Sequence, residues 1–358
     1  MSNRTLKNPA FCVLPFIEKF QKLDGSKYLC CYSNVPVAES EMNDLKLQIL
    51  DQQPIPHCIK CYNLEQQKII SARQLESIRW LRDPEVKNYI NTWQPGETAQ
   101  TYFYDIRFDN KCNLACISCN PRDSSLWAQE MGVTVPKHDL HFDVNEALTA
   151  KKVYLAGGEP LIIDKFIDFI TRLSQQDQQP ELIINTNLTR INDQLKHTLK
   201  QIKNLSLVVS IDAHGSVNEY HRWPMKWKKL VNNLEWARSI NCNIQFNTVA
   251  DAVSILNLQQ IQQLEHLADQ WNIEILINPT ALLINNLPEK LKTSVLENFK
   301  NIKQSKFYKQ DPMFKSRVAA IELAILQPGD DQLLAAFISG LDQRRNINHE
   351  TYLGVKLT

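Results

Sequence analysis

The chain has 358 residues, of which 43% are hydrophobic and 9 are glycine, and its 40 basic and 39 acidic side chains give a net charge of +1. This composition excludes wholesale disorder and leaves no global charge that would hold nucleic acid or an anionic membrane. The sequence has no apolar run near the roughly 18 residues of a membrane-spanning helix. Its first residues lack the long apolar stretch and small-residue cleavage site of a secretion signal, so we do not expect secretion. We therefore expect a cytoplasmic protein with reduced thiols, and neither a membrane nor a nucleic acid as its partner.

The predicted elements divide the chain into residues 1–100, 101–280 and 281–358. The first part carries many cysteines and short mixed elements. In the second part, β-rich runs alternate with amphipathic segments, which predicts an α/β fold with a parallel sheet, either open or curved into a partial barrel. The predicted strands are Tyr102–Phe108, Val153–Ala156, Leu182–Asn187, Leu205–Asp212, Ile244–Val249 and Ile273–Asn278. The predicted helices of this part include Phe166–Leu173, Trp227–Ile240 and Leu256–Trp271.

The third part lacks strand patterns, and its apolar spacing predicts three helices. These are Glu289–Gln304, Met313–Leu326 and Asp330–Asp342. One predicted apolar face runs through Phe314, Val318, Ile321 and Ile325. This face suits packing against the sheet, and the helices are candidates for a cover over the open side of a barrel.

The nine cysteines are unevenly spread, because eight of them fall within the first 119 residues. Cys112, Cys116 and Cys119 form a C-x3-C-x2-C loop directly after the first predicted strand. Three thiolates can bind three irons of a cubane cluster and leave the fourth iron open. Zinc is the alternative, but a structural zinc site needs four ligands and this loop supplies three.

The same part of the chain resembles the radical S-adenosylmethionine (radical SAM) superfamily. The resemblance rests on the cysteine loop, LAGGEP at Leu155–Pro160, NTN at Asn185–Asn187 and SIDA at Ser210–Ala213, in this order at successive strand ends. It implies a partial (β/α)6 parallel barrel and a 4Fe–4S cluster that binds S-adenosylmethionine. It also implies reductive cleavage to a 5′-deoxyadenosyl radical, hydrogen abstraction from a substrate, and an electron donor such as flavodoxin or ferredoxin.

The resemblance also implies roles for individual residues. Cys112, Cys116 and Cys119 would ligate the cluster. The residues expected to contact the cofactor or substrate are Gly157, Gly158, Glu159, Asn185, Ser210, Asp212, Arg222 and Asn247. The alternatives are a plain turn for GGEP, helix capping for the polar strand ends and a surface ion pair for Arg222. Ser118 departs from the family pattern, which usually has an aromatic residue before the third cysteine.

The N-terminal cysteines resemble a second iron–sulfur module. The order Cys12, Gly25-x4-Cys30-Cys31 and Cys58-x2-Cys61, followed by ExxxxxSxR at Glu65–Arg73, is similar to the auxiliary modules of SPASM and Twitch radical SAM enzymes. Here the module precedes the barrel, as in an N-terminal-Twitch arrangement. We assign Cys12, Cys30, Cys58 and Cys61 to an auxiliary 4Fe–4S cluster, with Cys31 as an alternative to Cys30 and zinc as the alternative metal.

Cys242 stands alone and alternates with Ile244 and Phe246, which predicts a buried thiol rather than a hydrogen-atom donor.

Three functions follow from these patterns. The auxiliary module favours a radical SAM enzyme that modifies a peptide or protein. The alternatives are a radical SAM enzyme for a small molecule, such as a sugar or nucleotide, and a non-catalytic iron–sulfur redox or regulatory protein. LAGGEP argues against the last, since an electron carrier needs no methionine site.

Overall fold

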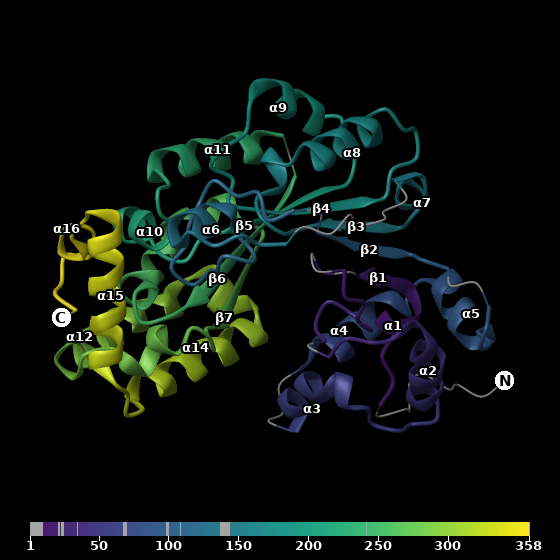
Figure 1. Cartoon of the computed structure of the whole chain (residues 1–358), viewed down its shortest axis with the longest axis horizontal. Helices are drawn as coiled ribbons and strands as arrows, with labels where there is room; N and C mark the ends of the chain where they lie inside the picture. The colour runs from purple at the N-terminus through teal and green to yellow at the C-terminus, as the bar shows by residue number, and fades with distance from the viewer. Residues whose placement is uncertain are drawn as a thin grey trace. The chain divides into compact units, whose positions relative to one another are not determined.

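The computed structural model describes residues 10–357 except 21, 23–24, 34, 67–69, 98–99, 108, 137–143 and 241. It contains a seven-stranded sheet whose strands are hydrogen-bonded in chain order (Figure 1). The strands are β1 Glu18–Phe20, β2 Phe103–Ile106, β3 Lys152–Leu155, β4 Glu181–Thr186, β5 Leu205–Ser210, β6 Asn243–Ala250 and β7 Gln270–Ile275. The sheet is parallel and does not close, so the predicted α/β fold with a partial barrel is confirmed.

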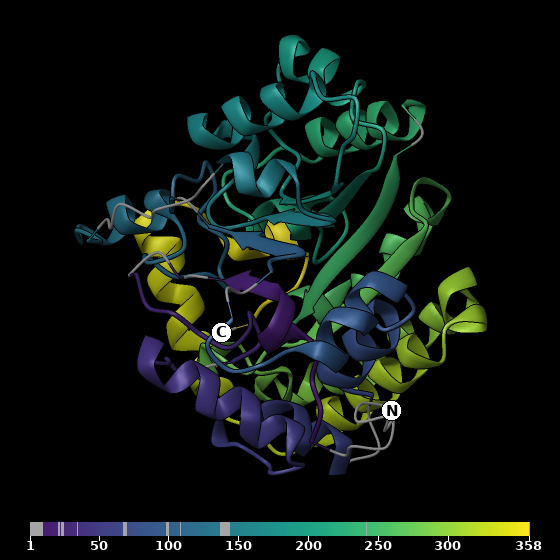
Figure 2. The ribbon, with the colours of Figure 1, turned by 90° about the vertical axis from the view of Figure 1, so that its right-hand side faces the viewer.

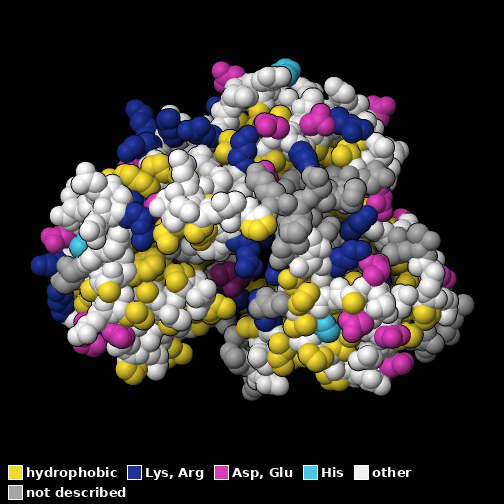
Figure 3. All heavy atoms as spheres, in the orientation of Figure 1, with side chains coloured by type: hydrophobic (Ala, Val, Ile, Leu, Met, Phe, Trp, Pro, Cys, Tyr) yellow, Lys and Arg dark blue, Asp and Glu magenta, His cyan; other side chains and the backbone are white. Residues whose placement is uncertain are grey.

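Two compact units make up the chain. The first comprises Met1–Asp109, Pro136–Ala156 and Arg172–Ile183, and the remaining residues form the second. Because this division follows contacts rather than chain order, the predicted domain limits at residues 100 and 280 stay a prediction. Among the described helices, none is both long and apolar enough to span a membrane. On the face drawn in Figure 3, side chains of both charges occur, with a group of basic side chains at the upper left.

Within the first unit, β1 pairs with β2 and β2 with β3. Its helices are α1 Leu14–Ile17, α2 Met42–Leu50, α3 Ile59–Gln66, α4 Ala72–Trp80, α5 Pro84–Thr92 and α7 Val144–Leu148. Phe16, Ile49 and Trp93 belong to one apolar core beneath these helices. The edge of Phe16 meets Trp93 at a ring-centroid distance of 5.2 Å.

The ExxxxxSxR segment forms a polar anchor in this unit. The Glu65 carboxylate accepts hydrogen bonds from Ser71 and from both Nε and Nη2 of Arg73. Arg73 is buried, and its Nη1 donates to the Phe11 carbonyl at 2.7 Å. Ser71 also caps α4 by accepting from the Gln74 amide. The motif thereby ties α3 and α4 to the segment that carries Cys12.

The second unit contains the pairs β5–β6 and β6–β7. Its helices are α6 Ser125–Met131, α9 Asp193–Leu199, α10 Gly215–His221, α11 Trp227–Ser239, α12 Glu289–Phe299, α13 Lys306–Gln310, α14 Pro312–Leu326, α15 Asp331–Arg345 and α16 His349–Leu353, and α8 Asp164–Ser174 crosses the boundary between the units. Figure 1 shows α9 and α11 along one face of the central strands. The yellow-green α14 and yellow α15 are also visible in Figure 2. The ring of Phe314 of α14 packs against the ring of Trp271 of β7, with 5.1 Å between the ring centroids. The predicted apolar face of α14 is buried.

Several predicted elements differ from the structure. Strand β1 is additional, so the sheet has seven strands instead of six. The last strand begins at Gln270, three residues before the predicted start, and the expected helix over Leu256–Trp271 is a 3-10 segment that ends at Leu267. Trp271 joins the strand because its ring packs on α13 and α14 while its Nε1 donates to Thr248 at 2.9 Å. Phe108, the predicted end of the first strand, lies outside the described residues.

Candidate functional site

The cysteine loop, residues 111–119, has no helix or strand of its own and is held by neighbouring backbone groups. The Ala115 amide donates to the Trp223 carbonyl at 2.6 Å, and the Ile117 amide donates to the His221 carbonyl at 2.8 Å. On the other side, the Trp127 Nε1 of α6 donates to the Cys116 carbonyl at 2.6 Å. Since buried backbone groups need partners, these bonds fix the path of the loop while its thiols stay available as ligands.

The three thiols of this loop affect one another electrostatically. Burial raises the pKa of Cys112 to about 12, and the next contribution comes from Cys116. Burial, followed by the charge of Cys116, also raises the pKa of Cys119. Bringing thiolates together in a half-buried loop is unfavourable unless a cation binds them. The all-sulfur donor set of three therefore fits the site-differentiated 4Fe–4S cluster that the resemblance implies.

The GGEP segment packs directly on the start of the cysteine loop. Gly157 and Gly158 have φ of +84° and +54°, and a Cβ on Gly158 would lie 2.4 Å from the Lys111 carbonyl oxygen. The Glu159 amide donates to the same carbonyl at 2.8 Å. Only glycine combines this conformation with so close a backbone approach. GGEP is thus more than an isolated turn, because it positions the entry of the loop.

Glu159 is buried, and its carboxylate is held by the protein. It accepts hydrogen bonds from the Thr186 Oγ1 at 2.6 Å, the Asn187 amide at 2.6 Å and the Leu161 amide at 3.1 Å. Burial raises its pKa to about 7 although these donors act in the opposite direction. These contacts give Glu159 a positioning role at the end of β4, and its contact with a cofactor stays a prediction.

A row of polar side chains crosses the sheet of the second unit, at the C-terminal ends of β4 and β5 and within β6 and β7. The Ser210 Oγ lies 3.4 Å from the Asn185 Oδ1, and Asn272 of β7 donates to the Asn247 Oδ1 at 3.0 Å. These four residues are half-buried. Half-buried polar groups on a sheet can bind a polar ligand, and a ligand contact of Asn185, Ser210 and Asn247 stays a prediction.

A buried charge network that no sequence pattern predicted adjoins the cysteine loop. His221 lies between two carboxylates, with Nδ1 2.9 Å from the Asp212 Oδ2 and Nε2 2.5 Å from the Asp251 Oδ2, and all three residues are fully buried. Burial alone would lower the pKa of His221, but the charges of Asp251 and Asp212 raise it to about 10. Burial raises the pKa of Asp212, but Arg222 and His221 outweigh it and bring the value to about 2.

Arg222 connects this network to the thiols. Its Nε lies 2.8 Å from the Asp212 Oδ2, and its Nη1 lies 3.7 Å from the Cys116 sulfur. The arginine is therefore a largely buried partner of the cysteine loop rather than part of a surface ion pair. Its charge lowers the pKa of Cys116, although burial is the larger effect and raises it. A bond from Arg222 to a cofactor carboxylate stays a prediction.

The C-terminal helix α15 also supports the loop. The Arg345 Nη2 donates to the Ala115 carbonyl at 2.8 Å, its Nε donates to Glu130 at 3.0 Å, and its guanidinium lies 5.0 Å from the centre of the Trp127 ring. No sequence pattern predicted this role of Arg345, because the residue lies more than 200 positions from its partners in the chain. A cover over the site by the C-terminal helices stays a prediction.

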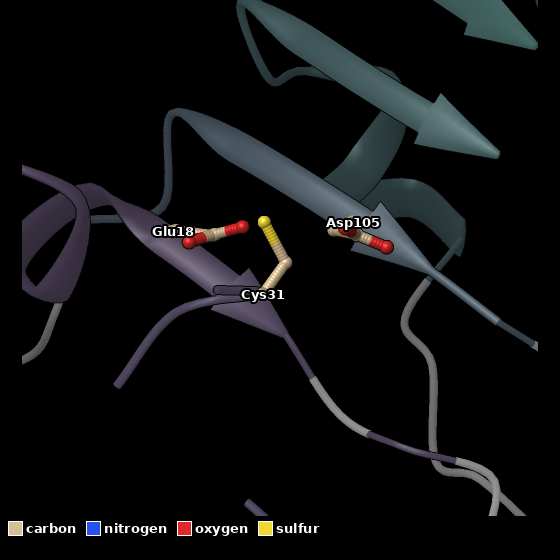
Figure 4. Close-up of side chains that lie close together, drawn as sticks. All are labelled: Glu18, Cys31 and Asp105. Carbon is tan, nitrogen blue, oxygen red and sulfur yellow. The ribbon is translucent and has the colours of Figure 1, made fainter. Parts of the chain in front are cut away.

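The first unit brings four N-terminal cysteines around one pocket. Cys12, Cys30, Cys58 and Cys61 are buried and line this pocket together with Arg73. Burial raises the pKa of Cys12 well above its usual value, and the other three thiols add to the effect. Cys31 is not among the lining residues and lies instead beside Glu18 and Asp105 (Figure 4). The structure therefore separates Cys30 from Cys31, while the cluster that the four would bind stays a prediction.

Cys242 is buried as predicted, and its thiol donates to the Ala237 carbonyl at 3.3 Å.

Gly158→Ala should damage the cysteine loop. The new Cβ would collide with the Lys111 carbonyl, and overpacking of this kind costs about 1–3 kcal/mol beyond the cost of a positive φ. Gly215→Ala is the matched control, because Gly215 has φ +61° and open space around its Cβ. We expect a lower unfolding midpoint and less bound iron in the Gly158 variant than in the Gly215 variant. Equal values for the two variants would contradict the packing argument.

The His221 network should make stability depend on alkaline pH. Because the folded pKa of His221 is raised to about 10, its contribution is fully present below the ordinary pKa of 6.5 and is lost as pH rises through about 10. His221→Gln should lower the free energy of unfolding at pH 7 by about 3–5 kcal/mol and flatten its decline between pH 7 and 10. Urea unfolding across this range tests the prediction, with the exposed His197→Gln as control, and an unchanged slope in the His221 variant would contradict it.

Comparisons with known proteins identify the family of this chain. Residues 106–291, more than half of the chain, match the model of the radical SAM superfamily. The GTP 3′,8-cyclase of Campylobacter lari is 26% identical over 151 residues, covering 40% of this chain and 45% of the relative. The GTP 3′,8-cyclase of Aquifex aeolicus is 28% identical over 150 residues, covering 41% of this chain and 42% of the relative. The matches thus span less than half the length of these relatives.

Among solved structures, SuiB of Streptococcus suis bound to S-adenosylmethionine aligns with a TM-score of 0.40 and 14% identity, covering 79% of this chain and 65% of that chain. The segment that matches the family model includes the cysteine loop, GGEP and the polar strand ends. This chain belongs to the radical SAM superfamily, an enzyme family whose members use a 4Fe–4S cluster and S-adenosylmethionine.

Proposed function

We propose that this chain cleaves S-adenosylmethionine reductively and abstracts a hydrogen atom from a substrate. The observation that carries the proposal is the gathering of Cys112, Cys116 and Cys119 in one loop, braced by GGEP, in a chain of the radical SAM superfamily. When bound, the cluster and S-adenosylmethionine would supply an electron and a 5′-deoxyadenosyl radical.

The protein's own residues would hold and orient these groups. The three cysteines would bind three irons, and Arg222 would offset the negative charge at Cys116. The half-buried amides and hydroxyl of Asn185, Ser210 and Asn247 would bind the nucleoside or the substrate. Ser118 provides no aromatic surface beside the loop, so the adenine would rely on other contacts.

A second cluster is part of the proposal. Cys12, Cys30, Cys58 and Cys61 line one pocket, and four thiolates would complete the coordination of a cubane. A four-cysteine zinc site is the alternative. The electron donor would be a small redox protein of the flavodoxin or ferredoxin type.

Two substrate classes each have an observation in their favour. A nucleotide is favoured by the relatives, which are named GTP 3′,8-cyclase, although the similarity covers less than half of this chain. A peptide or protein is favoured by the N-terminal cysteine module, whose counterparts occur in peptide-modifying radical SAM enzymes. We propose the nucleotide as the first class to assay, because its support is an alignment of this sequence rather than an association with a module.

Cys116→Ala should abolish the formation of 5′-deoxyadenosine in the presence of dithionite, because two thiolates cannot retain the site-differentiated cluster. Cys242→Ala, which removes a buried thiol outside the loop, should retain it. Normal 5′-deoxyadenosine production by the Cys116 variant would refute the cluster assignment.

A deuterium-transfer experiment with the wild-type chain distinguishes the substrate classes. Deuterium would appear in 5′-deoxyadenosine from ribose-deuterated nucleotides if the substrate is a nucleotide, and from deuterated peptides if it is a peptide.

Anaerobically reconstituted protein should contain about seven to eight irons per chain, from two cubane clusters. The variant with Cys112, Cys116 and Cys119 changed to Ala should stay brown and keep about four irons. Iron analysis and absorption spectra test this. If the triple variant is colourless and contains stoichiometric zinc, the four N-terminal cysteines bind zinc, and the auxiliary cluster is ruled out.

A further inference from the structure

A second group of potential metal ligands lies on the first unit, apart from the cysteine pocket. Glu18 and Phe20 share one face of β1, because alternate residues of a strand point the same way. The register pairs Phe20 with Asp105 of β2, and directly paired residues share a face. Glu18 and Asp105 are therefore diagonal neighbours on one side of the sheet. Cys31 lies in a turn beside this face, close to both carboxylates (Figure 4).

The ligand atoms of these three residues are close enough for one ion. One carboxylate oxygen of Glu18, the Cys31 sulfur and one carboxylate oxygen of Asp105 all lie within 4.8 Å of one another. Tetrahedral ligands at about 2.0–2.3 Å from zinc stand roughly 3.5 Å apart. Side-chain adjustments of about 1 Å would therefore close the site.

The local charges favour a cation at this position. Arg107 binds Asp105 with two nitrogens, Nε at 3.1 Å and Nη2 at 3.2 Å. Both carboxylate oxygens of Glu18 are buried, and neither accepts a geometrically good hydrogen bond within the described part of the chain. When ionised, two carboxylates and a thiolate carry three negative charges, of which Arg107 balances one. A divalent cation balances the other two, which removes the large penalty for burying unpaired charge.

We propose that Glu18, Cys31 and Asp105 bind one divalent cation of the zinc class, separate from the four-cysteine pocket. A thiolate selects against magnesium and calcium, while carboxylates are accepted by zinc. Arg107 orients Asp105 from outside the coordination sphere, as outer hydrogen bonds do at metal sites. The three protein ligands leave a fourth position, which a water molecule or a substrate oxygen would fill. Cys31 has its own function in this site, which accounts for its separation from Cys30.

The test uses the full chain with its iron–sulfur clusters reconstituted, washed with a chelator and equilibrated anaerobically with Zn²⁺. After gel filtration, we expect about one zinc per chain. Zinc X-ray absorption should report one sulfur ligand among oxygen ligands. Glu18→Gln, which preserves side-chain volume, should weaken zinc binding at least roughly tenfold without loss of iron. Exposed Glu39→Gln is the matched control and should bind zinc like the wild type.

Three results would overturn the proposal. The first is wild-type protein that retains no zinc. The second is a four-sulfur zinc environment, which would assign the metal to the cysteine pocket. The third is unchanged zinc affinity in both Glu18→Gln and Cys31→Ser. If either variant fails to fold, the sulfur count from the wild-type absorption spectrum decides between the two sites.

Discussion

The site of the second unit depends on holding a loop without secondary structure in one conformation. The cysteine loop cannot satisfy its own backbone groups, so the carbonyls of His221 and Trp223 at the end of α10 accept from its amides. The Gly158 backbone closes against Lys111 from another side. These contacts fix the position of each thiol. Without them, the irregular backbone would sample many conformations, and the three thiols would not be held together.

Electrostatics makes the same arrangement workable. Thiolates collected in a half-buried loop repel one another, and Arg222 lies against the sulfur of Cys116. An unpaired arginine would be costly at this depth, so Asp212 forms an ion pair with it and a second ion pair with His221. Asp251 pairs with the other nitrogen of His221 and is the last member of this charge network. The buried network therefore fixes both the position and the charge of the group that contacts the thiols.

Sequence patterns over short stretches predicted the strands, the buried helix face and the cysteine groups, which depend mainly on neighbouring residues. Short β-rich runs located five strands closely, and helical spacing found the buried face of α14. The resemblance to auxiliary iron–sulfur modules selected four thiols that line one pocket. Strand β1 has three residues and no room for a periodic signal. The position of β7 was set by the packing of Trp271, which depends on helices far along the chain.

Residues that act through distant partners were likewise beyond prediction. His221 sits next to the predicted Arg222, but Asp251, which completes its environment, follows a different strand. Arg345 reaches the cysteine loop from the C-terminal helix. Glu159 was predicted beside the cofactor, a contact that stays a prediction, but no sequence pattern showed that its carboxylate also holds the end of β4. Such roles arise from the assembled unit, and no spacing in the sequence encodes them.

The most direct measurement is electron paramagnetic resonance of the dithionite-reduced chain in which Cys12, Cys30, Cys58 and Cys61 are changed to Ser, with and without S-adenosylmethionine. This variant would retain only the cluster of the Cys112–Cys116–Cys119 loop. The account predicts a reduced 4Fe–4S signal whose g-values change when S-adenosylmethionine is added, because one iron is open to it. A cluster signal that does not respond to S-adenosylmethionine would contradict the account.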